Sequence, residues 1–351
     1  MKTALLAILL FCIMIFPHEL GHFIAAKRVG VKVNEFAFGM GPALWKKQGK
    51  ETLYSIRLFP IGGYCAMEGE DSDSDDSRSF RSQSVWKRMI VLVAGAFMNF
   101  VLGFVMVMIM TCMSDSVPTM EIRGFSGQKA EDGTVEYLSG SYEAGLRHGD
   151  IIVEMDGMHI FTTTDLSYML GSSSTHDVEV LRDGERLLFE DVKFENRIDG
   201  GTIDFGLEYA EKNIGNVLSY SGKDCVSLGR LVWLSLRDLV TGKYGAEELS
   251  GPVGVVTTID ETAQQGENVK EKSMSLIYLT ALITINIGVF NLLPIPGLDG
   301  GRLLFCLIEI IRRKPVKPEH EGYVHLAGMV LLFGIMIFAT YNDIVRLVTG
   351  G

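Results

Sequence analysis

The chain has 351 residues, of which 47% are hydrophobic, and its mean hydropathy of +0.23 is high for a soluble protein. Its formal net charge of −11 argues against a nucleic-acid partner, which would favour a basic surface. The five cysteines show no spacing typical of a disulfide framework or of a cysteine zinc site. Length and composition therefore indicate a membrane protein with two or more domains.

Four apolar stretches are long enough to cross a bilayer, which takes about 20 residues. They are Thr3–Ala26, Met89–Met113, Leu276–Leu293 and Tyr323–Thr340. The first one also resembles a signal peptide, because Lys2 precedes an apolar run. However, three ionisable residues between His18 and His22 come before any usable cleavage site, so a retained span is favoured.

The loops between these stretches predict the orientation, because short cytoplasmic loops are rich in lysine and arginine. The basic residues between the first two stretches are Lys27, Arg28, Lys32, Lys46, Lys47, Lys50, Arg57, Arg78, Arg81, Lys87 and Arg88. Those between the last two are Arg302, Arg312, Arg313, Lys314 and Lys317. Both loops are therefore expected in the cytoplasm, with the N-terminus and the region from about 114 to 275 on the other side.

The regions between the spans differ in their expected structure. Residues 27–88 contain short β-like runs broken by glycine, which predict hairpins against the membrane. Residues 118–195 predict a compact β domain with a short helix at "TTDLSYMLG" and a hairpin that turns at "DG" in "VEVLRDGERLLF". Residues 217–240 predict an amphipathic helix on the membrane surface. "LSGPVGVV" predicts a glycine–proline turn that leads to the third span.

The first span ends in the motif H-E-x-x-H, formed by His18, Glu19 and His22. Positions four apart lie on one face of a helix, so both imidazoles can bind one zinc ion, and Glu19 can act as the general base. A catalytic zinc site usually has three protein ligands and one open position. One ligand is therefore missing from this motif.

The third span ends in a matching polar interruption, "NIGVFNLLPIPGLDGGRLL" at residues 286–304, in which Asp299 is the only carboxylate. Its prolines and glycines break the helix, and irregular backbone survives at membrane depth only inside protein or beside a wet cavity. The two interruptions therefore indicate one shared intramembrane site.

"HELGH" and "NLLPIPGLDGG" together resemble the site-2 protease family of intramembrane zinc metalloproteases, in particular its bacterial PDZ-bearing, RseP-like branch. "FAFGMGPALW" and "YSIRLFPIGGYCAMEGE" are similar to the family's membrane-reentrant β-loop. "SYEAGLRHGDIIVEMDG" is similar to a PDZ domain. "AGAFMNF" resembles a second-span signature that usually reads A-G-P-x-x-N, with Ala96 here in place of the proline.

This resemblance implies that His18, His22 and Asp299 bind Zn²⁺, that Glu19 is the general base and that Asn286 and Asn291 bind substrate. It implies membrane-spanning protein substrates, such as anti-sigma factors or signal-peptide remnants, already cut by another protease. The location implied is the bacterial inner membrane. Two alternatives remain: a catalytically inactive PDZ-bearing membrane scaffold, against which the intact Glu19 argues, and a metal transporter, which would not need Glu19.

The expected fold is a polytopic α-helical membrane protein with about four transmembrane helices, a membrane-associated β-hairpin loop and one extracytoplasmic PDZ-like α+β domain. In chain order the expected regions are the first transmembrane helix (1–26), the β-loop region (27–88), the second transmembrane helix (89–113), the PDZ-like domain (114–210), the amphipathic helical region (211–275), the third transmembrane segment (276–304), and a cytoplasmic loop with the fourth helix (305–351).

Overall fold

The computed structural model describes residues 2–70, 74–125, 127–129, 135–137, 139–194, 204–243 and 250–349. The expected regions 27–88, 114–210 and 211–275 therefore lie partly outside the described residues. The chain forms two compact units, one made of Met1–Met106 with Val232–Gly351 and the other of Val107–Leu231.

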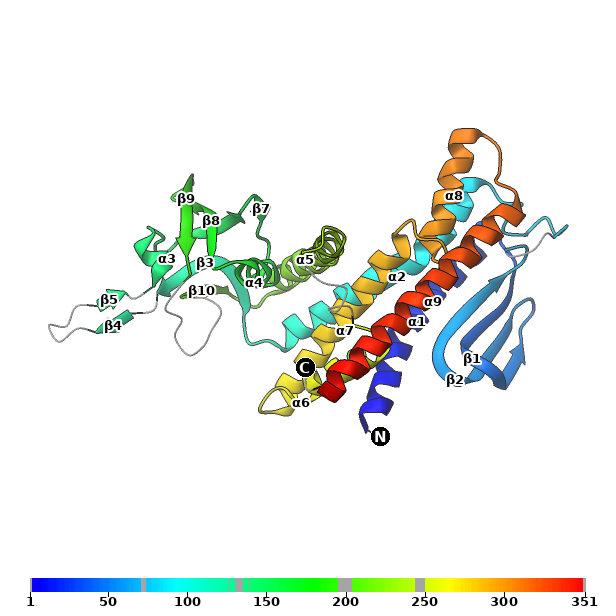
Figure 1. The fold of residues 1–351 in the computed structure, drawn as a ribbon, viewed down its shortest axis with the longest axis horizontal. Coiled ribbons are helices and arrows are strands. Elements are labelled where there is room, and N and C mark those ends of the chain that lie inside the picture. Colours follow the sequence, from blue (N-terminus) through cyan, green and yellow to red (C-terminus); the bar gives the residue numbers. More distant parts are fainter. Residues whose placement is uncertain are drawn as a thin grey trace. The chain divides into compact units, whose positions relative to one another are not determined.

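Among the described residues, four helices are long and apolar enough to cross a membrane. They are α1 (Lys2–Val29), α2 (Val85–Met113), α7 (Val269–Leu292) and α9 (Pro318–Thr349) (Figure 1). Each contains one of the four predicted apolar stretches almost completely, which confirms the expectation of a polytopic membrane protein. Every helix extends beyond its apolar stretch, because neighbouring polar residues can continue a helix after the hydrophobic pattern ends.

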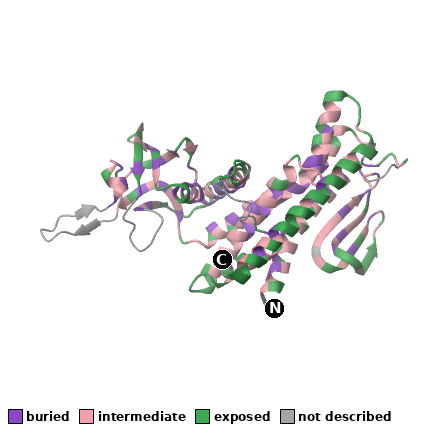
Figure 2. Cartoon of the chain, in the orientation of Figure 1, coloured by how far each residue is buried: buried purple, intermediate pink, exposed green. Residues whose placement is uncertain are grey.

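The outward face of α9 is largely exposed, as the green bands along this helix in Figure 2 show. Large apolar side chains, including those of Val330, Leu331 and Ile337, lie on this face. Such a surface would be unfavourable in water and fits contact with lipid.

A long antiparallel hairpin follows α1 and packs against it, formed by β1 (Val33–Gln48) and β2 (Leu53–Met67) (Figure 1). The glycines do not break the strands into the short runs that the sequence predicts. Gly39 and Gly62 instead have φ of 83° and 88° within strands whose pairing register shifts repeatedly. These glycines therefore allow bulges within a continuous hairpin.

Two helices of the first unit were not expected. The turn predicted at "LSGPVGVV" is wrong, because α6 (Pro252–Gln264) begins there with proline at its first position, where no backbone donor is needed. The N–H groups of Gly251 and Gly254 donate to the Asp343 carboxylate of α9 at 3.0 and 2.7 Å. Similarly, α8 (Asp299–Arg312) begins at the aspartate of "LDGG", where the sequence indicated only helix-breaking residues.

The second unit is built on a sheet with the strand order β10-β3-β6-β8-β9, with β7 paired to β6. The strands are β3 (Val117–Phe125), β6 (Ile151–Met155), β7 (Met158–His159), β8 (Thr175–Arg182), β9 (Glu185–Lys193) and β10 (Phe205–Ala210), beside a separate pair, β4 (Gly127–Lys129) and β5 (Val135–Tyr137). The hairpin expected at "DG" is confirmed: Asp183 and Gly184 have φ of 51° and 87°, which a type I′ turn requires.

Two short helices, α3 (Gly140–Glu143) and α4 (Thr163–Ser172), complete the β domain, and α5 (Ile214–Val240) confirms the expected amphipathic helix. One side of α5 is held to α4 through the buried Asp224 carboxylate, which accepts hydrogen bonds of 2.7 Å from the hydroxyls of Thr162 and Thr164. The other side exposes apolar residues such as Ile214 and Val226.

Candidate metal centre

The H-E-x-x-H motif lies within α1, beyond the middle of this candidate membrane helix. Because His18 and His22 are one helical turn apart, their side chains leave the helix on the same side. Both are buried, with exposed fractions of 9% and 7%. Two histidines on a buried face of an apolar helix need polar partners, since unpaired polar groups are costly there.

The partner is Asp299, which the chain brings back from the end of α7. α7 ends at Leu292, and a tight turn leads directly into α8, whose first residue is Asp299. A Cβ atom on Gly300 would lie 2.0 Å from the carbonyl oxygen of Leu293, and one on Gly301 would lie 2.6 Å from that of Ile295. The "GG" of the motif therefore allows the turn to close and sets the position of Asp299.

Three side-chain atoms form a nearly equilateral triangle. The Nε2 atoms of His18 and His22 are 3.2 Å apart. The Oδ2 atom of Asp299 lies 3.3 Å from Nε2 of His18 and 3.2 Å from Nε2 of His22. This Oδ2 is buried and has no hydrogen-bond partner in the described part of the chain. The structure thus brings the three predicted ligands together.

The triangle has the size that zinc requires. Nitrogen and oxygen ligands lie about 2.0–2.1 Å from zinc, so two ligands of a tetrahedral site are about 3.3 Å apart. All three edges agree with this separation within about 0.1 Å. Within the described residues, this is the one group of three or more His, Cys, Asp or Glu side chains close enough to hold a metal ion. The donor set of two imidazoles and one carboxylate also suits zinc.

A cavity of about 390 Å³ opens beside the triangle. Its lining residues are His18, Glu19, His22, Tyr64, Cys65, Ala66, Met67, Glu70, Leu92, Asn291, Gly297, Leu298 and Asp299. Of the two asparagines predicted to bind substrate, Asn291 lines this cavity and Asn286 does not. Asn286 lies earlier on α7, and its buried Oδ1 has no hydrogen-bond partner among the described residues.

Glu19 is held at the cavity wall by β2. The backbone N–H of Cys65 donates a hydrogen bond to its carboxylate. A Cβ atom on Gly63 would lie 3.3 Å from Cγ of Glu19, so the strand approaches this side chain closely. Burial raises the pKa of the Cys65 thiol, and the Glu19 carboxylate raises it further.

Sequence reasoning missed the backbone partners of this site. The N–H of Cys65 contacts Glu19, and the carbonyl of Val91 in α2 contacts His22. Backbone groups leave no signature in a sequence, so neither contact could be predicted. The buried Asn99 in α2 lies beside His18. Two signals for it were present in the sequence, an asparagine inside an apolar span and the last position of the segment that resembles A-G-P-x-x-N.

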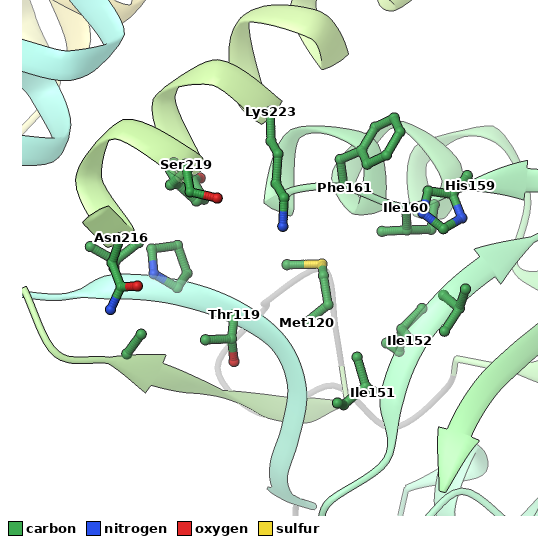
Figure 3. A pocket seen from close by; sticks show the side chains of 15 residues that line it. Thr119, Met120, Ile151, Ile152, His159, Ile160, Phe161, Asn216, Ser219 and Lys223 are labelled. Atoms are coloured by element: carbon green, nitrogen blue, oxygen red, sulfur yellow. The ribbon is translucent and has the colours of Figure 1, made fainter. Parts of the chain in front are cut away.

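A second cavity, of about 440 Å³, lies within the other unit, between α5 and strands β3 and β6. Figure 3 shows the side chain of Lys223 pointing from α5 towards Met120, with Ile151 and Ile152 on the strand side. The lining contains one histidine, His159, and no carboxylate or cysteine. This cavity therefore lacks the ligands for a comparable metal site.

The described part of the chain has four candidate membrane helices, and one of them carries an H-E-x-x-H motif that meets a carboxylate from a second interrupted segment. These are the features of a membrane-embedded metallopeptidase. The model of peptidase family M50 matches residues 6–335. The chain therefore belongs to peptidase family M50, the site-2 protease family. This confirms the predicted family and the predicted class of enzyme, a site-2 type zinc metalloprotease.

The chain is also similar to individual proteins over almost its whole length. It is 30% identical to the "Regulator of sigma-W protease RasP" of Bacillus subtilis, covering 99% of each chain. It is 28% identical to the "Zinc metalloprotease RasP" of Bacillus licheniformis, covering 99% of this chain and 100% of the relative. It is 34% identical to a protein of Clostridium perfringens whose name describes it provisionally as a zinc metalloprotease, covering 97% of each.

Proposed function

We propose that this protein is an intramembrane zinc endopeptidase that cleaves the membrane-spanning segments of single-span proteins. The observation that carries the proposal is the ligand triangle of His18, His22 and Asp299, with Glu19 on the wall of the same cavity. Three ligands at tetrahedral spacing leave a fourth position open, as in catalytic zinc sites. The names of two relatives, which include the words "zinc metalloprotease", also support this assignment.

The chemistry is the addition of water to a peptide carbonyl. Zinc, when bound, activates the water and polarises the carbonyl. Glu19 accepts the proton from the attacking water as its oxygen bonds to the carbonyl carbon. Glu19 then delivers this proton to the amide nitrogen as the C–N bond breaks, which yields a carboxylic acid and an amine. The N–H of Cys65 holds the Glu19 carboxylate in position for both transfers.

A substrate helix must be unwound before it can be cleaved, because its peptide bonds are hidden in its own hydrogen bonds. The freed backbone groups then need new partners, since each unpaired group costs several kcal/mol. Asn291 lines the cavity and can both donate and accept a hydrogen bond. The β2 segment from Tyr64 to Met67 lines the same cavity and can pair with an extended peptide. The proposed role of Asn286 has less support, because this residue is outside the lining.

The proposed orientation has the hairpin and the α8–α9 loop in the cytoplasm, and the N-terminus and the PDZ-like domain outside, in the bacterial inner membrane. Single cysteines at exposed positions in a cysteine-free background test it. Asp75→Cys and Lys314→Cys should react with an impermeant reagent only from the cytoplasmic side, and Glu185→Cys only from outside. The opposite labelling pattern would show that the charge bias misled us.

The proposed substrates are membrane proteins already shortened by another protease, such as anti-sigma factors or signal-peptide remnants. The name of the Bacillus subtilis relative, a regulator of sigma-W, supports the first class. We further propose that the PDZ-like domain excludes substrates that keep a bulky extracytoplasmic domain. Deletion of residues 118–195 should then allow intact substrates to be cleaved. Unchanged size selection after this deletion would place the filter elsewhere, for example in α5.

The central experiment separates zinc binding from catalysis. Purified Glu19→Gln should keep stoichiometric zinc but lose cleavage of a single-span substrate, because the variant loses the base and keeps all three ligands. His22→Ala and Asp299→Ala should lose both. Proteolysis retained by Glu19→Gln would refute the mechanism. A wild-type protein that binds zinc but cleaves no membrane segment would instead favour the alternative, an inactive PDZ-bearing scaffold.

A further inference from the structure

One face of α2 lies directly behind the two imidazoles, and the function proposed above gives it no role. Val91, Gly95 and Asn99 follow one another at intervals of four residues, so they share this face. The Val91 carbonyl lies 2.9 Å from Nδ1 of His22, and Nδ2 of Asn99 lies 3.4 Å from Nδ1 of His18. A Cβ atom on Gly95 would lie 2.3 Å from His22 and 2.8 Å from His18. Both rings therefore rest against this face.

The contact with Val91 fixes the tautomer of His22. A carbonyl oxygen can only accept a hydrogen bond, so Nδ1 of His22 must carry the proton. The neutral ring then has its lone pair on Nε2, which is the atom in the ligand triangle. A hydrogen-bond acceptor behind the ring thus presents the correct nitrogen to a metal.

His18 also needs a hydrogen-bond acceptor behind its ring, but the neighbouring Asn99 side chain presents a donor there. If Nε2 of His18 presents its lone pair, then Nδ1 carries the proton and needs an acceptor. The amide group of Asn99 points its Nδ2 donor at this nitrogen, while its Oδ1 is buried without a hydrogen-bond partner in the described part of the chain. Rotating the amide by 180° replaces this donor–donor contact with an Nδ1–H···Oδ1 hydrogen bond and gives Oδ1 its partner. The two orientations have almost the same shape.

We propose that Asn99 is a positioning residue, whose Oδ1 accepts a hydrogen bond from Nδ1 of His18 and thereby holds Nε2 ready for the metal. Together with the Val91 carbonyl, it makes this face of α2 the outer support of both histidine ligands. The inference rests on the proposed zinc site. It also gives a role to a fully buried asparagine in an apolar span, where an amide is costly unless it is hydrogen-bonded.

Zinc affinity tests this proposal without relying on activity. The full-length protein, purified in detergent, is titrated against a competing chelator, and the spectrum of the Co²⁺-substituted protein reports the geometry of the site. Asn99→Leu has a similar volume but no acceptor and should weaken zinc binding by about 10- to 100-fold. Asn99→Asp keeps the acceptor and should stay within about threefold of the wild type or bind more tightly. Thr111→Val, which removes another buried polar group of α2, should leave the affinity unchanged.

The outcomes separate this inference from the proposed function. A wild-type protein that does not bind zinc stoichiometrically would refute the proposed function and the inference with it. Wild-type affinity in Asn99→Leu, with zinc bound normally by the wild type, would refute the inference alone. If Asn99→Leu does not fold, the smaller Asn99→Ala replaces it with the same expectation. An equal loss in Asn99→Asp and in the apolar variant would also overturn the proposal, because the acceptor would then be irrelevant.

Discussion

Gly95 of α2 has no room for a side chain, and Gly95→Ala tests the arrangement of the metal centre. The added Cβ would lie 2.3 Å from Nε2 of His22, 2.6 Å from its Cε1 and 2.8 Å from Cε1 of His18. Ordinary contacts between such atoms are about 3.5 Å or more. At least one ring must therefore move by about 1 Å.

A displacement of this size is large compared with the tolerance of a metal site, in which ligand distances hold within about 0.2 Å. We expect Gly95→Ala to weaken zinc binding by at least about 100-fold, since one of three ligands leaves its position. Zinc affinity is measured by chelator competition. Helix content and thermal unfolding in detergent show whether the protein still folds.

The matched control is Gly334→Ala in α9, another candidate membrane helix. A Cβ atom there meets nothing within 4 Å, so this variant should bind zinc as the wild type does. Its stability should stay equal or rise by up to about 1 kcal/mol, because alanine has the higher helix propensity. A folded Gly95→Ala protein whose zinc affinity stays within threefold of the wild type would refute the arrangement described here.

Three further predictions concern other parts of the molecule. Arg182→Ala should destabilise the β domain by about 3 kcal/mol, because it leaves the fully buried Asp150 carboxylate without its bidentate partner. Loss of the exposed Arg186 side chain in Arg186→Ala should cost only about 0–1 kcal/mol. Similar denaturation midpoints for the two variants would contradict this prediction. Burial raises the pKa of Asp224, so the folded state binds the Asp224 proton more tightly than the unfolded state does. The free energy of unfolding should therefore rise as pH falls through that pKa, by at most about 1.4 kcal/mol per pH unit. Hydrogen exchange in α4 and α5 should show this slope in the wild type and lose it in Asp224→Asn. Asn291→Ala should retain zinc but slow cleavage more for a leucine-rich substrate helix than for one with glycine near the cut; equal losses on both substrates would assign this residue to helix packing.

The sequence by itself determined the features that depend on local spacing. Membrane crossing follows from the length of the apolar runs, and all four were predicted because a helix of about 20 apolar residues hydrogen-bonds its own backbone across the lipid. His18 and His22 share a helix face because helical geometry repeats every 3.6 residues. The turn at Asp183 and Gly184 was predicted because few residues other than asparagine, aspartate and glycine adopt positive φ at low cost.

The tertiary structure decided what depends on contacts between distant segments. Pro252 begins a helix instead of a turn because Asp343, far along the chain, accepts hydrogen bonds from the N–H groups around it. α8 can start at Asp299 because two following glycines pack against the carbonyls of the preceding turn, a contact that propensity cannot show.

In the metal centre too, some features follow from local sequence and others from contacts between distant segments. The motifs named the three ligands as candidates, but only the folded chain brings Asp299 within 3.3 Å of both histidines. The supports behind the rings are a backbone carbonyl and an asparagine of α2, and their roles depend on the distance between helices, not on spacing along one helix. Local periodicity therefore predicts which side chains share a face, whereas packing between helices determines which faces meet.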